Sequence, residues 1–216
     1  MRRFSNLRRK LTMTFWNHNS HFHDLILSQL PSKFDTALDV GSGSGDFATR
    51  LANQARHVDA VEIDPKAVSI AVGTCAPFEN INLITSSFLD PSFAAGRYDV
   101  VTALAALHHM DLEQSLTQAK RILRPGGTLA ILGLYRESNL IDHSFSIASV
   151  VAHRFLTWRN RNNLAPASNL DLQVQPPADT LPQIKALADR VIPGATVQRR
   201  LLWRYTLFWR KPESAG

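Results

Sequence analysis

The segment Ala37-Leu38-Asp39-Val40-Gly41-Ser42-Gly43-Ser44-Gly45-Asp46-Phe47-Ala48 decides the fold. An apolar run ends in three alternating glycines, and apolar residues then recur at helical spacing, which predicts a strand, a glycine loop and a helix. Glycine has no side chain, so such a loop lets a ligand approach the backbone at the end of a strand. A second apolar run ends in Glu62, about seventeen residues after Gly45. Its carboxylate can accept hydrogen bonds from both hydroxyls of a ribose, which indicates a cofactor containing a nucleoside.

The composition of the loop narrows the choice of cofactor. A dinucleotide-binding loop typically reads G-x-G-x-x-G and places a pyrophosphate at the helix N-terminus. Here Asp46 stands where the third glycine would be, and Asp39 comes just before the loop. Two carboxylates disfavour a pyrophosphate but suit the ammonium and sulfonium charges of S-adenosylmethionine.

The loop resembles the first motif of the class I S-adenosylmethionine-dependent methyltransferases, and Val61-Glu62-Ile63-Asp64-Pro65 resembles the second. Strands are predicted at 82–85 and 97–103, with Leu107-His108-His109-Met110 after the latter. A helix over about 112–123, a Pro-Gly-Gly turn and a fifth strand follow. Over about residues 35–135, this order is similar to the methyltransferases of quinone biosynthesis and many small-molecule enzymes.

The resemblance implies an α/β fold that is Rossmann-like and doubly wound. Its mostly parallel seven-stranded sheet would have an antiparallel C-terminal strand and helices on both faces. We expect one domain over 1–216, with a helical cap at 1–34, a cofactor-binding core at 35–135, an acceptor-selecting insertion at 136–180 and a C-terminal helix and strand pair at 181–216. Within the later parts we predict helices at 140–158 and 182–191, a loop at 159–177, and strands at 196–202 and 205–209.

The resemblance also implies which residues contact the cofactor: Asp39, Gly41, Ser42, Gly43, Glu62, Ile63, Ser87, Phe88 and Ala103. One departure concerns the adenine, because the family commonly has an acidic and a small residue where Ser87 and Phe88 stand. The Ser87 hydroxyl can still contact the adenine amino group, and Phe88 can pack on the adenine face. Asp90 is a possible substitute for the usual acidic residue.

Methyl transfer requires alignment of the reacting atoms, exclusion of water and sometimes removal of a proton. His109 and His108 follow the fourth strand, at the edge where ligands bind in such sheets, and histidine titrates near neutrality. They are the first candidates for a general base, and His21 and His143 are the second. The alternative is that the histidine pair serves only in loop packing.

Aromatic and histidine side chains gather before the first strand and in the predicted insertion. Trp16, His18 and His21 would help to close the site, with His143 of the insertion near the acceptor. The alternatives are a surface helix with satisfied histidines, Trp16 and Phe22 as core anchors, and an insertion helix that simply packs. A zinc site from the N-terminal histidines is disfavoured because no cysteine pair supports it. We expect no metal, since Ala103 ends the fourth strand where metal-assisted enzymes carry carboxylates.

The net charge of +6 raises nucleic acid as an acceptor. However, Leu104-Ala105-Ala106-Leu107 stands where base-flipping amino-methylating enzymes carry an Asn/Asp-Pro-Pro-aromatic motif. We therefore expect transfer to an oxygen or nitrogen of a small molecule. The alternatives are an RNA methyltransferase, a non-catalytic methyltransferase-like binding protein, and an oxidoreductase with an unusual loop.

Cysteine usage and hydropathy bear on the compartment. The single cysteine, Cys75, excludes an internal disulfide and fits a reducing compartment. No apolar run reaches the length of a membrane span, so we expect a cytoplasmic protein. The oligomeric state is left open by the sequence.

Overall fold

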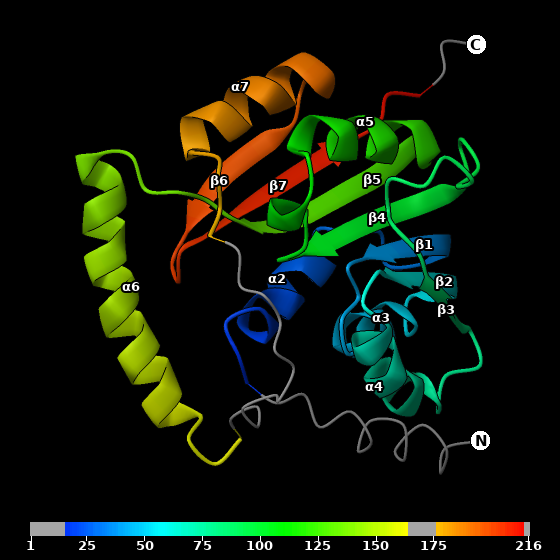
Figure 1. The fold of residues 1–216 in the computed structure, drawn as a ribbon, viewed down its shortest axis with the longest axis horizontal. Coiled ribbons are helices and arrows are strands. Elements are labelled where there is room, and N and C mark those ends of the chain that lie inside the picture. Colours follow the sequence, from blue (N-terminus) through cyan, green and yellow to red (C-terminus); the bar gives the residue numbers. More distant parts are fainter. Residues whose placement is uncertain (1–15, 164–175, 214–216) are drawn as a thin grey trace.

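A computed structural model describes residues 16–163 and 176–213 of the chain. Much of the predicted cap (1–15) and of the predicted loop (164–175) lies outside the described residues. The described part is built around one seven-stranded sheet with helices on both faces (Figure 1). This confirms the predicted fold class.

The strands follow the order β3-β2-β1-β4-β5-β7-β6 across the sheet. The strand β7 pairs antiparallel with both β5 and β6, whereas the pairs among β1 to β5 are parallel. The reversed strand is therefore β7, as predicted for the C-terminal region. The strand bounds are Phe34–Val40 (β1), Ala55–Glu62 (β2), Ile81–Thr85 (β3), Tyr98–Leu104 (β4), Leu123–Leu134 (β5), Thr196–Arg200 (β6) and Arg204–Arg210 (β7).

The helices begin at capping residues that the sequence supplies. Asp64 accepts a hydrogen bond from the backbone N–H of Lys66 at the start of α4, and Asn139 and Thr180 form capping boxes at α6 and α7. The helix bounds are Ser20–Phe22 (η1), His23–Ser28 (α2), Asp46–Leu51 (α3), Pro65–Cys75 (α4), Leu107–His109 (η2), Leu112–Ile122 (α5), Leu140–Arg159 (α6) and Leu181–Val191 (α7).

One boundary differs from the prediction. The sequence predicted a Pro-Gly-Gly turn between a helix and the fifth strand, but β5 begins at Leu123 and takes in this segment. The backbone explains the difference, because Gly126 N–H donates to the Lys211 carbonyl (2.9 Å) and Lys211 N–H donates to the Gly127 carbonyl (2.8 Å). Pairing with the chain beyond β7 thus extends the strand through glycines that alone would favour a turn.

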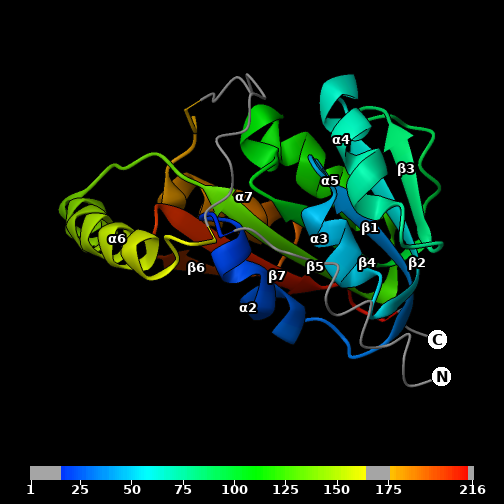
Figure 2. The ribbon, with the colours of Figure 1, turned by 90° about the horizontal axis from the view of Figure 1, so that it is seen from below.

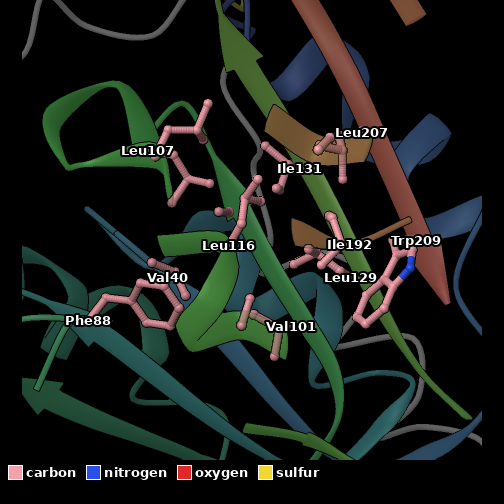
Figure 3. Packing of buried hydrophobic residues seen from close by; sticks show 14 of the residues in the cluster. Val40, Phe88, Val101, Leu107, Leu116, Leu129, Ile131, Ile192, Leu207 and Trp209 are labelled. Atoms are coloured by element: carbon pink, nitrogen blue, oxygen red, sulfur yellow. The ribbon is translucent and has the colours of Figure 1, made fainter. Parts of the chain in front are cut away.

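Two hydrophobic cores lie on opposite faces of the sheet. One packs α5 and α7 against the sheet through Leu116 and Ile184, and Figure 3 shows part of this cluster. The other packs α2 and α3 through Ile26 and Leu51, and α4 lies beside α3 and β3. Figure 2 shows α2 and α3 near one another on their side of the sheet. In the described residues, no helix combines the length and hydropathy needed to cross a bilayer.

The order of the strands indicates the edge of the sheet at which a ligand is expected to bind. The strand β1 pairs with β2 on one side and with β4 on the other, so the order of the chain reverses at β1. Such a reversal is called the switch point of the sheet, and ligands of open α/β sheets bind beside it, at the carboxyl ends of the strands. The loops that leave β1, β2, β3 and β4 at this edge carry the glycines, Glu62, Ser87 and the histidine pair.

Candidate functional site

Two glycines of the loop, Gly41 and Gly43, have a left-handed backbone but different surroundings. Gly41 has φ +63°, and a Cβ there would lie 2.4 Å from the Cβ of Ala106, so this glycine lets the loops after β1 and β4 touch. Gly43 has φ +53°, but a Cβ there would meet no atom within 4 Å. Its open side leaves the backbone accessible, which is the property that the sequence predicted for ligand approach.

Glu62 is held against this loop at the end of β2. One carboxylate oxygen accepts a hydrogen bond from Gly43 N–H (2.9 Å), and the other accepts from the N–H groups of Ile63 (2.8 Å) and Asp64 (3.0 Å). The side chain is partly exposed. Each oxygen can accept more than one hydrogen bond, so the carboxylate can also take the hydroxyls of a ribose.

Asp39 is a buried acid at the other side of the loop. Its side chain is 2% exposed, and one oxygen accepts a hydrogen bond from the hydroxyl of Thr102 (2.8 Å). The second oxygen is buried and has no partner among the described residues. Burial raises the pKa of Asp39 to about 7, with the negative charge of Glu62 adding to the rise and the Thr102 hydrogen bond opposing it. A cationic ligand would supply the missing partner.

Two further buried polar atoms near the loop lack partners among the described residues. They are the hydroxyl of Ser42, within the loop, and Nδ1 of His108, which follows Ala106 on the facing loop. Buried polar groups in proteins are rarely left unpaired, so a cluster of them marks where a ligand supplies hydrogen bonds. Together with Asp39 and the open side of Gly43, these atoms fit a ligand with a polar, positively charged amino-acid part.

His108 and His109 lie at the same edge, on η2. Their ring centroids are 3.9 Å apart with an interplanar angle of 41°. Burial, together with positive charge from His109 and Arg204, lowers the pKa of His108 to about 4. The imidazole of His108 is therefore neutral at neutral pH and a weak proton acceptor. His109 is the more exposed of the two.

The residues predicted to hold an adenine are only partly available. Ser87 accepts a hydrogen bond from Leu89 N–H (3.2 Å) and is half-buried. The ring of Phe88 is 3% exposed and belongs to the hydrophobic core, so it is not free to stack on a ligand, and only its backbone remains for contact. Ile63, by contrast, is 66% exposed beside Glu62 and offers the apolar surface that Phe88 does not.

The predicted contacts at Ala103 and Asp90 also need revision. Ala103 is fully buried in β4, which continues to Leu104, so a ligand at the strand end would meet the residues after Ala103. The carboxylate of Asp90 accepts from Ser92 N–H (2.8 Å) and lies 3.4 Å from the Ser86 hydroxyl. These hydrogen bonds of Asp90 stabilise the turn that begins at this residue.

The N-terminal segment contacts α6 and the residues that follow it. His18 Nε2 lies 2.8 Å from His153 Nδ1, and the backbone N–H of Trp16 donates to the carbonyl of Asn163 (2.7 Å). Burial lowers the pKa of His18 to about 4, together with the charges of Arg204 and His153. The indole N–H of Trp16 is buried without a partner among the described residues.

The other histidines of the N-terminal segment and of α6 have contacts of their own. His143 is exposed at the start of α6, and its Nδ1 lies 3.1 Å from the carboxylate of Glu137. His21 packs edge-on against Phe22, and His23 is buried against Phe47. Among the described residues, no group of three histidine, cysteine or carboxylate side chains is arranged to hold a metal ion.

Arg204 is a residue that the sequence reading missed. It is 9% exposed at the start of β7, and its guanidinium donates to the side-chain oxygen of Asn19 (3.0 and 3.2 Å) and to the carbonyl of Leu202 (3.2 Å). It thereby ties the N-terminal segment to the sheet. Nothing in the run of β7 distinguishes this arginine from a surface charge, because its burial depends on a segment far away in the chain.

Comparison with known proteins agrees with this geometry. Residues 38–131 match the family model described as a methyltransferase domain. The chain is 31% identical over 202 residues to an uncharacterized methyltransferase of Mycobacterium tuberculosis, covering 91% of this chain and 98% of that protein. It is 36% identical over 119 residues to the 27-O-demethylrifamycin SV methyltransferase of Amycolatopsis mediterranei, covering 50% of this chain and 42% of that protein.

A solved structure supports the fold independently. A putative S-adenosylmethionine-dependent methyltransferase from Methanococcus maripaludis superimposes with a TM-score of 0.62 at 17% identity, over 91% of this chain and 86% of that one. The near full-length relative and the matched domain indicate the same family, and the buried polar atoms that lack partners among the described residues fit its cofactor. The chain belongs to the class I S-adenosylmethionine-dependent methyltransferases.

Proposed function

We propose that this methyltransferase transfers the methyl group of S-adenosylmethionine to an oxygen or nitrogen of a small molecule. The observation that carries the proposal is the set of buried polar atoms without partners among the described residues, in Asp39, Ser42 and His108, on two loops that touch at the switch point of the sheet. Such a set fits a ligand that brings both charge and hydrogen bonds.

The cofactor would be held by the first three loops of this edge. Asp39 and Ser42 would take the amino-acid part, and Glu62 would take the ribose while keeping the loop in place through Gly43. Ile63 and the backbone at Ser87 and Phe88 would flank the adenine. When bound, S-adenosylmethionine supplies a methyl group already activated by the positive charge on sulfur, so the protein's task is alignment.

The acceptor would lie on the side of η2 and the N-terminal segment. His109, exposed on η2, would take a proton from an acidic hydroxyl or ammonium group of the acceptor. His108, neutral and half-buried, would orient the acceptor through Nδ1. Trp16 and His18 would help exclude water, because their segment is joined to α6 and β7.

A small acceptor is favoured over RNA by the surroundings of the site and not by the names of relatives, which include both a rifamycin and an rRNA methyltransferase. The N-terminal segment and α6 approach this edge of the sheet, whereas an RNA substrate needs an open basic groove.

Transfer of a radioactive methyl group tests the proposal. The protein would be incubated with methyl-labelled S-adenosylmethionine and, separately, with panels of carboxylic acids, phenols, hydroquinones and amines, and with total RNA. We expect labelled product from one small-molecule panel, and at least about tenfold less product from the Glu62→Ala variant when the cofactor is below its Kd. Label in RNA alone would overturn the small-molecule proposal, and cofactor binding without transfer to any panel would favour the binding protein.

The histidines are tested once an acceptor is known. His109→Ala should lower kcat by about a hundredfold for an acceptor that loses a proton, with an unchanged cofactor Kd. His108→Ala should raise KM more than it lowers kcat. If both variants keep normal turnover over the neutral pH range, the histidine pair serves only in packing.

A further inference from the structure

The helix α6 presents an apolar face to solvent. Seven of the eleven exposed large apolar side chains of the described residues lie on this one helix. Five of them form one line along the helix, because they are spaced by seven, four, four and three residues: Leu140, Ile147, Val151, Phe155 and Trp158. In Figures 1 and 2, α6 lies at the edge of the molecule, away from α3 and α4. The seven residues are Leu140, Ile141, Ile147, Val150, Val151, Phe155 and Trp158.

The inner face of α6 packs Leu156 into a hydrophobic core, but its first three turns are attached by hydrogen bonds from polar side chains. Asp142 is fully buried and pairs with Arg199 (2.5 Å). The hydroxyl of Ser149 accepts from Leu202 N–H (2.9 Å), and that of Ser146 accepts from the indole of Trp203 (2.5 Å). A helix on the surface of a water-soluble protein has the opposite pattern, with its apolar side inward. The outward apolar face of α6 is therefore built to meet something other than water.

The formal charges exposed on α6 itself are of one sign. Asp142 is the only acidic residue of α6, and it is buried in an ion pair. Arg154 and Arg159 are exposed on the helix, and the guanidinium of Arg161 lies 5.8 Å from the centroid of the Trp158 ring. Long arginine side chains can keep their stems along an apolar surface while their charged ends reach outward. The face thus combines aliphatic, aromatic and cationic groups, without an exposed carboxylate on the helix.

We propose that α6 binds flat on the surface of an anionic lipid bilayer. Its line of apolar side chains would enter the boundary between headgroups and acyl chains, with Trp158 and the arginines at headgroup level. An interfacial helix of this kind is recognised by an apolar face bordered by arginine or lysine and aromatic residues. The net charge of +6 adds to the attraction of an anionic surface.

A second copy of the chain fits the same face less well. Pairing two α6 helices through Ile147, Val151 and Phe155 would bring Arg154 and Arg159 of each copy to a helix that offers no exposed carboxylate. Lipid phosphates supply the counter-charges that a second α6 lacks. The proposal rests on α6 alone and does not depend on the acceptor or on the site at the switch point.

Co-sedimentation with vesicles tests the proposal. The full chain should bind vesicles of phosphatidylcholine mixed with phosphatidylglycerol and should bind pure phosphatidylcholine far more weakly. The double variant Phe155→Ala/Trp158→Ala should reduce partitioning by at least about tenfold, because two exposed aromatic anchors are lost. Arg154→Gln should reduce binding to the anionic vesicles by about fivefold and lessen its sensitivity to salt.

The matched control is Ile70→Ala/Val72→Ala, which removes two exposed apolar side chains from α4 and should leave vesicle binding unchanged. Calorimetry with S-adenosylhomocysteine and circular dichroism would show that each variant keeps its fold. Sedimentation velocity in the absence of lipid should give a monomer for the wild type. Absence of vesicle binding, equal loss in the α4 control, or a dimer that the α6 variant dissociates would overturn the proposal, the last in favour of a second copy.

Discussion

The carboxyl group of Asp39 is placed where protein stability and ligand binding make opposite demands. Burial raises its pKa to about 7, above the ordinary 3.8, so the folded protein keeps a proton that the unfolded chain has lost between these values. Stability contributed by this group therefore falls as pH rises through that window. Asp39→Asn carries no charge and should have a higher Tm than the wild type at about pH 8, where the buried carboxylate is most unfavourable.

The same variant should bind S-adenosylmethionine at least about tenfold more weakly, because the carboxylate that faces the cationic ligand is gone. In the wild type, affinity should increase between about pH 6 and pH 8 as Asp39 loses its proton. Thermal unfolding and calorimetry on both proteins measure the two effects. An Asp39→Asn variant that is less stable than the wild type at high pH, or that binds as well as the wild type, would contradict this role.

Gly41 and Gly43 share a left-handed backbone but differ in what surrounds them. Gly43→Ala should lower the free energy of unfolding by only about 1–2 kcal/mol, the strain of the positive φ. Its methyl group would nonetheless occupy the open side of the loop and weaken cofactor binding. Gly41→Ala adds a clash with Ala106 and should lose more stability. Urea denaturation with calorimetry separates the two, and equal stability losses with normal binding in Gly43→Ala would disprove the assignment.

At the scale of elements, a buried ion pair is one of the contacts that attach α6 to the sheet. Burial acts to raise the pKa of Asp142, but hydrogen bonds from Ser138 and the charge of Arg199 outweigh it and hold the pKa below its usual value. The stabilisation is present at neutral pH and is lost as pH falls through the lowered pKa. Asp142→Ala leaves Arg199 without its carboxylate, so we expect a loss of about 3–5 kcal/mol at neutral pH.

Urea denaturation at two pH values checks this anchor. The difference between Asp142→Ala and the wild type should shrink on acidification below the ordinary pKa of an aspartic acid, as the wild-type carboxylate becomes protonated. Glu137→Ala is the comparison, because it removes a more exposed carboxylate at the same end of α6. A loss of the same size at both pH values would show that packing, not charge, attaches the helix.

For the molecule as a whole, the sequence predicted what depends on local pattern. The alternating glycines, the acid that ends β2 and the capping residues act within a few positions, so the order of elements and the loops at the sheet edge were predictable. Residues whose environment comes from distant segments were not. Arg204 is buried through Asn19, and Phe88 is turned into the core, although both lie in runs that read as ordinary surface or edge positions.

The strained backbone after β4 was also not predictable from local sequence. Ala105 has φ +54°, a left-handed conformation that non-glycine residues rarely adopt, and its N–H donates to the carbonyl of Leu132 (2.7 Å). An alanine gives no sign of this in the sequence. The conformation results from the adjoining strand, and it turns the chain toward η2, where His108 and His109 lie.

Calorimetric titration with S-adenosylmethionine tests the whole arrangement most directly. The wild type should bind, and Glu62→Ala should bind at least about tenfold more weakly, since each charge-assisted hydrogen bond to the ribose contributes about 1.5–3 kcal/mol. Glu79→Ala, which removes an exposed carboxylate beyond α4, should bind like the wild type. A wild type that does not bind S-adenosylmethionine, or that binds a nicotinamide dinucleotide more tightly, would contradict the proposed site.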